Sequence, residues 1–361
     1  MKLSDVTLRE ADQMPGRSYT ADQKITAANH LDRLGLTFIQ AGFPATGEKD
    51  QHVIRTLASS LDASVIGLAR AVPNDVEAAL DAEADIIEIF APLSNLQLDH
   101  LIKKSREEMM TAMSEAVGQA LAANVGVHVS LLDAFRTDSD VLVNAFEQFP
   151  DVEYITLADT VGAMTPPSVE TALSELSNSV DLSRVGVHFH DDLGVATANT
   201  MTAHRLGVGK ADVSVASLGE RAGNPALEEV VAIGVLGDEG NYGLDEKQLV
   251  PVCTDVLEVL GEPIDPRKPI LGTEVYEHES GIHTAAMLEK PALFEPFPPD
   301  RLGAERRLLF GDGTGRSGAK QLLKRAGIEP TERRIDDLLQ RLSERGPLET
   351  FEAVSVAAEL N

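Results

Sequence analysis

The chain has 361 residues, of which 43% are apolar and 25% are charged, and its 31 Lys and Arg against 58 Asp and Glu give a formal net charge of −27. This apolar content excludes a disordered chain, because disordered segments cannot bury enough apolar surface to offset their ordering entropy. The acidic balance argues against a nucleic-acid partner, since phosphate backbones require a basic surface, and no run of about 18 apolar residues indicates a membrane span.

The first two-thirds of the chain alternate short apolar or β-branched runs with longer amphipathic, Ala-rich stretches, which is the pattern of repeated βα units. The apolar runs predict eight strands, near Leu3–Arg9, Thr37–Gly42, Ser64–Ala69, Ile86–Ala91, Gly126–Leu131, Tyr154–Ala158, Gly186–His190 and Asp212–Ala216. The stretches between them predict helices that begin near Ala21, Glu48, Asn74, Leu101, Asp138, Ser168, Ala196 and Ala226. Eight parallel strands joined by helices predict a closed (β/α)8 TIM barrel over residues 1–237.

After Gly237 this alternation gives way to Gly- and Pro-rich connections with intermittent helices, predicted at Lys320–Ala326 and Arg333–Glu344. We therefore expect residues 238–361 to form a C-terminal linker and helical appendage that packs against the barrel or a partner subunit. The glycine-rich run Gly311–Arg316 is not interpreted as a dinucleotide site, because it lies far downstream of the first strand and no βα context is predicted before it.

Two features of the sequence concern its location. Cys253 is the only cysteine, which excludes an internal disulfide, and Met1 is followed by no signal-peptide pattern, so we expect a cytoplasmic protein. The acidic excess is spread along the chain, which suggests a halophilic source because high salt screens self-repulsion. Ordinary acidic solubility is the alternative.

Candidate reactive residues follow the first and seventh predicted strands. In barrels of this kind the reactive groups lie at the carboxyl ends of the strands. His188 and His190 are two residues apart, so both side chains point to one side and could bind one metal ion. Glu10 would add a carboxylate ligand, and Arg9 could stabilise negative charge on an enolate or alkoxide. Taken alone, His188 and His190 could be two hydrogen-bonded histidines at a strand end, and Arg9 and Glu10 could be an ion pair that only stabilises the barrel.

Several separated segments, in the same order along the chain, resemble motifs of the DRE-type TIM-barrel metalloenzymes, and specifically of the isopropylmalate, homocitrate and citramalate synthases. These enzymes condense acetyl-CoA with 2-oxo acids. The segments are Asp5–Gln13, Ala41–Pro44, Lys103–Glu108, Ala158–Gly162, His188–Gly194, Gly219–Asn224 and, beyond the barrel, His278–His283.

The resemblance implies a divalent metal ion, Mg, Mn or Zn, bound by Glu10, His188, His190 and Asn224. It also implies that acetyl-CoA is the co-substrate, and that the 2-oxo acid is contacted by Arg9, Gln13 and Thr160. Metal and Arg9 then polarise the oxo group, a base removes a proton from the acetyl methyl group, and water hydrolyses the thioester after the carbon–carbon bond has formed.

The segment around His283 reaches the neighbouring subunit's site in this family, which implies a homodimer. His283 is the candidate for a role in proton transfer, because a near-neutral imidazole can both accept and donate a proton. A histidine that only caps or packs a loop is the competing interpretation. The implied activity is that of a 2-isopropylmalate synthase-like acyltransferase of amino-acid biosynthesis.

Four positions depart from the pattern of these synthases. Gln40 replaces a common Glu, Gln97 a common His, Leu132 the Glu of a Glu-Asp pair and Phe294 a common Tyr. These changes predict a pocket that is less charged than in a typical synthase. They leave open a different 2-oxo acid with a bulky or apolar end, a rearranged proton transfer or reduced activity.

Two other functions remain possible from the sequence alone. A related metal-dependent C–C lyase or aldolase shares the barrel and the metal, but the lyase of this kind needs a reactive cysteine on a Gly-rich loop, and Cys253 lies in a predicted helix. A non-catalytic barrel paralogue would explain the four departures, but Arg9, Glu10, His188 and His190 are intact.

Overall fold

The computed structural model describes residues 1–237, 240 and 242–361. The chain divides into two compact units, Met1–Pro263 and Ile264–Asn361. The domain boundary expected at residue 237 falls before helix α11 (Leu249–Leu260), which packs against α2 (Ala21–Asp32) within the first unit. The amphipathic α11 therefore contributes to the barrel unit rather than to the C-terminal appendage.

The first unit is a closed barrel of eight parallel strands, in which β1 pairs with both β2 and β8. This closure confirms the TIM barrel predicted from the βα alternation. The strands are β1 Lys2–Asp5, β2 Phe38–Gly42, β3 Ser64–Arg70, β4 Ile86–Pro92, β5 Gly126–Leu132, β6 Tyr154–Asp159, β7 Val185–Phe189 and β8 Lys210–Val213.

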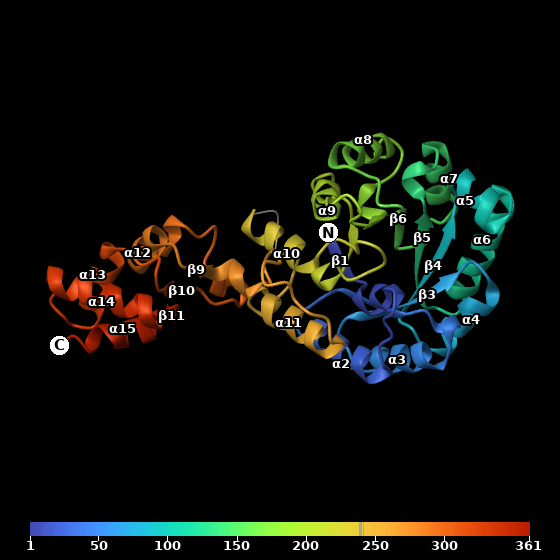
Figure 1. The fold of residues 1–361 in the computed structure, drawn as a ribbon. Helices are drawn as coiled ribbons and strands as arrows, with labels where there is room; N and C mark the ends of the chain where they lie inside the picture. The colour runs from blue at the N-terminus through green and yellow to red at the C-terminus, as the bar shows by residue number, and fades with distance from the viewer. Residues whose placement is uncertain (238–239, 241) are drawn as a thin grey trace. The chain divides into compact units, whose positions relative to one another are not determined.

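Helices surround the strands of this barrel (Figure 1). Besides α2 and α11 they are α3 Glu48–Ala58, α4 Pro73–Asp81, α6 Arg106–Ala122, α7 Ser139–Gln148, α8 Pro166–Leu176, α9 Ala196–Arg205 and α10 Leu227–Leu236. The predicted starts agree within two residues except at α6, which was expected near Leu101. Ser105 caps α6 by accepting the backbone N–H of Glu108, and Glu108 accepts the N–H of Ser105 in return, so the helix begins after this capping box.

The first strand is shorter than predicted, because the chain turns at Asp5. The Asp5 carboxylate accepts the backbone N–H of Thr7 at 3.0 Å and its hydroxyl at 2.9 Å, a local contact that competes with strand pairing. Residues Thr7–Glu10 then form the helical turn α1. Arg9 and Glu10 therefore lie on a helical turn after β1, not on the strand itself.

The eighth strand also ends earlier than predicted, at Val213. Ala216 and Ser217 adopt left-handed backbone conformations with φ of 51° and 61°, which no strand can accommodate. The chain therefore leaves the barrel wall before the Gly219–Asn224 segment. Gly219 is required there, since a Cβ atom would lie 2.4 Å from Oδ1 of Asn224.

The buried Asp5 carboxyl provides a test of this turn through its pH dependence. Burial raises the pKa of Asp5 to about 7, and the Thr7 hydrogen bonds offset only part of that effect. Ionisation above the unfolded value of about 3.9 therefore costs folding free energy, by about 1.4 kcal/mol per pH unit up to the folded pKa. The side chain in Asp5→Asn stays neutral at both pH values. We therefore expect the free energy of unfolding of this variant, relative to that of the parent protein, to rise by roughly 2–3 kcal/mol from about pH 5 to pH 7. Denaturant unfolding at both pH values measures this difference, and a pH-independent difference contradicts it.

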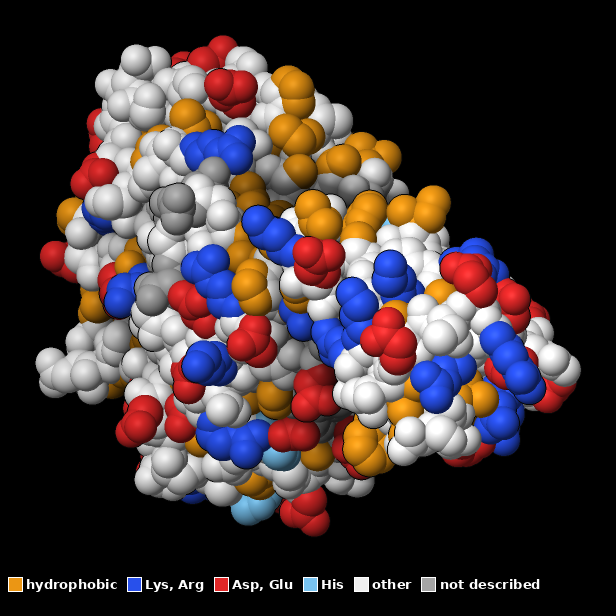
Figure 2. All heavy atoms as spheres, turned by 90° about the vertical axis from the view of Figure 1, so that its left-hand side faces the viewer, with side chains coloured by type: hydrophobic (Ala, Val, Ile, Leu, Met, Phe, Trp, Pro, Cys, Tyr) orange, Lys and Arg blue, Asp and Glu red, His pale blue; other side chains and the backbone are white. Residues whose placement is uncertain are grey.

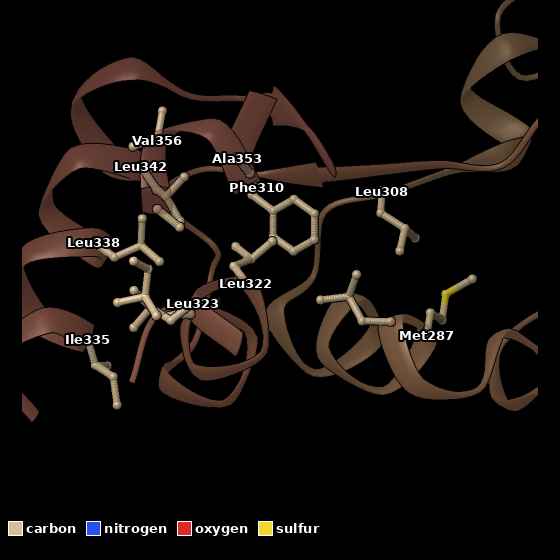
Figure 3. Packing of buried hydrophobic residues seen from close by; sticks show 14 residues of the cluster. Met287, Leu308, Phe310, Leu322, Leu323, Ile335, Leu338, Leu342, Ala353 and Val356 are labelled. Atoms are coloured by element: carbon tan, nitrogen blue, oxygen red, sulfur yellow. The ribbon is translucent and has the colours of Figure 1, made fainter. Parts of the chain in front are cut away.

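The second unit has a hydrophobic core of its own. Its expected packing against the barrel or a partner subunit stays a prediction. Phe310, Leu322 and Leu338 are fully buried in this core (Figure 3). Its helices are α12 Gly281–Glu289, α13 Arg316–Arg325, α14 Glu332–Arg345 and α15 Thr350–Ala358, and its three-stranded sheet has the order β11 (Leu348–Glu349), β10 (Arg307–Phe310), β9 (Glu277–His278). The two helices predicted here are confirmed as α13 and α14.

The glycine-rich run Gly311–Arg316 lies between β10 and α13, so a short strand that the sequence analysis did not predict precedes it. No helix of the described residues is long and apolar enough to cross a membrane. On the face shown in Figure 2, Lys and Arg side chains are interspersed with Asp and Glu side chains.

Candidate active site

A cavity of about 210 Å³ extends from the carboxyl ends of the barrel strands into the barrel. Its polar lining comes from Arg9, Glu10, Gln13, Gln40, Glu88, Ser130, Thr160, His188, His190, Asp212 and Glu220, and its apolar lining from Leu68, Phe90, Leu132 and Ala158. Parallel strands of a closed barrel end on one face, which is why residues distant in sequence meet here. The cavity thus contains most of the site residues expected from the sequence.

Glu10, His188 and His190 lie close enough together to bind one metal ion. Each offers one ligand atom, and these atoms all lie within 4.8 Å of one another. His188 lies in the buried strand β7, and His190 follows the end of that strand. The two rings are 5.1 Å apart between centroids, and Nε2 of His188 is 3.5 Å from Oε1 of Glu10. The alternation of side chains along β7 and the turn after β1 together produce this cluster.

The orientation of His188 is set from both sides of its ring. Its Nδ1 lies 3.0 Å from Oδ2 of Asp212, and its Nε2 lies 3.3 Å from Nδ2 of Asn224. Asn224 donates the same Nδ2 to the carbonyl oxygen of Phe189 at 3.0 Å. A carboxylate behind a histidine is the usual support of a metal-binding imidazole, because it fixes the tautomer and the ring direction.

Three buried polar atoms of this cluster have no hydrogen-bond partner among the residues that the structure describes: Glu10 Oε2, His190 Nδ1 and Asn224 Oδ1. Leaving such atoms unpaired costs free energy. Carboxylate and amide oxygens with imidazole nitrogens are ligands for Mg, Mn or Zn ions. The residues present therefore fit the divalent metal implied by the sequence.

The protonation states of the cluster also fit a cation. Burial, together with the neighbouring His188, lowers the pKa of His190 to about 4, so its imidazole is neutral near pH 7. Burial alone would raise the pKa of Glu10, but Arg9 and His188 bring that pKa below its usual value. A neutral imidazole and an ionised carboxylate are the forms that bind a metal ion.

Arg9 is held between two acceptors at the edge of the cavity. Its Nε donates to Oε1 of Gln40 at 2.6 Å, and its Nη1 forms an ion pair with Glu10. Gln13 lies in the short helical turn that follows and also lines the cavity. The Thr160 hydroxyl accepts the backbone N–H of Asp133 at 2.8 Å, which leaves its own proton available for donation.

The four departures from the synthase pattern occupy different environments. Gln40 is buried in β2 and Leu132 ends β5, and both line the cavity. Gln97 ends the short helix α5 (Asn95–Gln97) and is not among the described residues that line the cavity. Phe294 belongs to the second unit, where its ring stacks on that of His283 in α12, with 4.0 Å between centroids.

Sequence reasoning missed three charged residues inside the barrel: Glu88, Lys210 and Asp212. All are at most 2% exposed. Glu88 is the one charged residue in the apolar strand Ile86–Pro92, and a charged residue in a buried strand requires a partner. Glu88 could thus have been recognised from the sequence as a buried charge. Its partner Lys210 could not, since β4 and β8 are not neighbours in the sheet. Buried charges therefore lie at this level of the barrel, and a pocket less charged than in a typical synthase stays a prediction.

Comparisons with known proteins agree with this architecture. The family model described as HMGL-like matches residues 1–256, and the model described as homocitrate synthase post-HMGL domain-like matches residues 270–347. A probable 2-isopropylmalate synthase of Methanopyrus kandleri is 37% identical over 350 residues, covering 96% of this chain and 70% of that protein. The homocitrate synthase AksA of the same organism is 36% identical over 349 residues, covering 95% and 87%.

Among solved structures, the HMG-CoA lyase of Bacillus subtilis is similar in fold, with a TM-score of 0.66 at 24% identity, covering 74% of this chain and 95% of that chain. This likeness concerns the barrel fold alone. The two family matches and the identity over nearly the whole chain carry the assignment: the chain belongs to the HMGL-like TIM-barrel family that includes the isopropylmalate, homocitrate and citramalate synthases.

Proposed function

We propose that the chain is a 2-isopropylmalate synthase-like acyltransferase, which condenses acetyl-CoA with a monocarboxylic 2-oxo acid and hydrolyses the resulting thioester in amino-acid biosynthesis. The observation that carries this proposal is the convergence of Arg9 with Glu10, His188 and His190 at one cavity. The Arg9 guanidinium beside a metal-binding cluster suits a reaction in which negative charge develops on a substrate oxygen.

In this proposal Glu10, His188, His190 and Asn224 hold the divalent metal ion. When bound, the ion supplies Lewis acidity toward the 2-oxo group. Asp212 keeps His188 in the required tautomer through the contact with Nδ1. The buried surroundings strengthen these electrostatic interactions, because little water reaches them.

The other residues of the site act on the substrates directly. Arg9 and Gln13 contact the oxo-acid end, and the Thr160 hydroxyl donates to its carboxylate. His283 takes part in moving the proton of the acetyl methyl group, and it does so from a second copy of the chain in a homodimer. The ring of His283 is packed against Phe294, which limits its orientations.

The charges around the cavity argue for a monocarboxylic substrate. Among the described residues that line it, Arg9 is the only Lys or Arg, whereas Glu10, Glu88, Asp212 and Glu220 are acidic. Arg9 already serves the oxo-acid end, and Lys210 is fully buried and paired with Glu88 and Asp212. Among the described residues that line the cavity, a second carboxylate on the substrate therefore finds no Lys or Arg to pair with. Burying an unpaired charge costs several kcal/mol, which disfavours a dicarboxylic acceptor such as 2-oxoglutarate.

We expect kcat/KM for 2-oxoisovalerate or pyruvate to exceed that for 2-oxoglutarate by roughly 100-fold or more, as a difference of several kcal/mol requires. Release of the CoA thiol, measured at high salt with each acceptor, gives the three values. High salt is included because the acidic excess of the chain predicts a halophilic source. A clear preference for 2-oxoglutarate contradicts the proposed substrate class.

An arginine introduced into the cavity wall tests the same substrate preference by favouring the dicarboxylic acceptor. Leu132→Arg should raise the relative kcat/KM for 2-oxoglutarate by about tenfold or more, because it supplies the missing partner. Leu96→Arg is the matched control, since Leu96 is 53% exposed and does not line the cavity. Equal effects of the two variants would mean that net charge rather than pocket chemistry selects the acceptor.

The alternative C–C lyase is less well supported. The cysteine that such a lyase needs on a Gly-rich loop has no counterpart, because Cys253 is fully buried inside α11. The non-catalytic alternative leaves the unpaired buried atoms of Glu10, His190 and Asn224 without an explanation.

A further inference from the structure

A chain of polar contacts runs beneath the cavity from Arg9 to a buried lysine. Arg9 Nε donates to Gln40 Oε1 at 2.6 Å, and Gln40 Nε2 donates to Glu88 Oε2 at 2.8 Å. Glu88 in turn accepts from Nζ of Lys210, at 3.4 Å to Oε2 and 3.5 Å to Oε1. Strands β2, β4 and β8 supply Gln40, Glu88 and Lys210, so the contacts cross the interior of the barrel.

Lys210 also serves the metal-binding side of the site. Its Nζ lies 3.1 Å from Oδ1 of Asp212, whose Oδ2 contacts Nδ1 of His188. Burial alone would lower the pKa of Lys210, but Asp212 and Glu88 beside it raise that pKa above its usual value, so the ammonium remains charged. Lys210 is therefore the common anchor of two branches, one toward Arg9 and one toward His188.

The amide of Gln40 can occupy only one orientation in this chain. Arginine can only donate hydrogen bonds, and an ionised carboxylate can only accept them. The carbonyl oxygen of Gln40 must therefore face Arg9, and its NH2 group must face Glu88. Glu88 thus fixes which atom Gln40 presents to Arg9, without a contact of its own to the Arg9 side chain.

The same geometry explains why residue 40 is not a glutamate here. A carboxylate in place of the Gln40 amide would lie about 2.8 Å from that of Glu88, and two like charges at that distance repel strongly in a buried setting. Positions 40 and 88 together therefore accommodate one amide and one carboxylate. Lys210 compensates the charge of Glu88, which is only 1% exposed.

We propose that Lys210, Glu88 and Gln40 form a relay of positioning residues that holds Arg9 in its place at the cavity. The consequence for catalysis rests on the proposed function, because Arg9 acts there on the oxo-acid substrate. The placement of Arg9 itself does not depend on that function and can be measured without turnover.

Glu88→Gln interrupts the relay with almost no change in shape. The amide introduced by this substitution offers a single oxygen to two donors, Lys210 and the NH2 group of Gln40, so the Gln40 amide is free to rotate and Arg9 loses its acceptor. We expect solvent exchange of the Arg9 Nε–H, followed by NMR and assigned by its loss in Arg9→Lys, to accelerate by about tenfold or more. The Nε–H of Arg70, which donates to Asp75 at 2.6 Å, is the internal control and should not change.

The double variant Gln40→Glu/Glu88→Gln exchanges the amide and the carboxylate. It restores an acceptor for Arg9, a donor toward residue 40 and an acceptor for Lys210, so the Arg9 Nε–H exchange should become slow again. The single variant Gln40→Glu, with two facing carboxylates, should be the least stable of the three. A rescue of this kind distinguishes a relay from three residues that act independently.

Kinetics give the second readout of the same variants. We expect Glu88→Gln to lower kcat/KM for the 2-oxo acid by about tenfold, with KM for acetyl-CoA unchanged, and the double variant to recover most of that loss. Unchanged Arg9 exchange in Glu88→Gln, or a double variant no better than the single one in folding or exchange, overturns the relay. If exchange responds as expected but the parent protein turns over none of the 2-oxo acids, the proposed function fails and the relay stands.

Discussion

Replacing both His188 and His190 by alanine is expected to remove the divalent metal from the protein and to lower the condensation rate by about 10³-fold or more, because polarisation of the oxo group by a metal ion is worth several kcal/mol. These two imidazoles, with Glu10, offer ligand atoms within 4.8 Å of one another. Elemental analysis of the purified variant measures metal per chain, and thiol release from acetyl-CoA measures the rate.

Removal of two exposed histidines provides the matched control. His52 and His100 are exposed on the barrel unit, so His52→Ala/His100→Ala should leave metal content and rate unchanged. Circular dichroism of both variants checks that the barrel is folded. An unchanged metal content in the folded His188→Ala/His190→Ala variant would show that the metal site has been assigned to the wrong residues.

Replacing Arg9 by alanine should lower kcat by about 10²–10³-fold, the usual loss when one donor to a developing oxyanion is removed. Arg9→Lys should recover only part of it, because lysine keeps the charge but lacks the fork that reaches Gln40 and Glu10 together. Arg33→Ala is the control, since Arg33 is a half-exposed residue paired with Asp255. Retention of full kcat in Arg9→Ala would exclude Arg9 from the reaction.

The same variant tests the shared site. Mixing Arg9→Ala chains with His283→Ala chains should restore part of the activity, because some heterodimers then contain one site with both residues intact. No restoration, in a sample shown to exchange subunits, would count against a site completed by the segment around His283.

The barrel could be predicted from the sequence because the alternation of apolar runs with amphipathic stretches extends over long segments of the chain. Eight apolar runs separated by amphipathic helices leave little choice once connections between parallel strands must be helical. The ends of the strands depend instead on single contacts. The Asp5–Thr7 hydrogen bonds end β1 at Asp5, well before the predicted end at Arg9, and no apolar pattern encodes such a contact.

Much of the candidate site could also be predicted, for a different reason. His188 and His190 lie at the end of β7, and Arg9 and Glu10 lie on the turn that follows β1. Chemistry is expected at this face of a barrel, and the cavity contains all four residues. The pairing of Glu88 with Lys210 could not be predicted, because it joins residues 122 positions apart across the barrel interior. Gln40 was interpreted from sequence as the loss of a charge, whereas the structure shows its amide between Arg9 and Glu88.

The most direct test of the account is the metal dependence of the reaction in the unmodified protein. The protein is stripped with a chelator and then supplied with Mg, Mn or Zn, acetyl-CoA and 2-oxoisovalerate or pyruvate at high salt. We predict one CoA thiol released for each 2-oxo acid consumed, only when a metal is present, together with a product heavier than the acceptor by one acetyl-derived CH2COOH unit plus one hydrogen. CoA release that is independent of both metal and 2-oxo acid, or no release with any acceptor, would contradict the account.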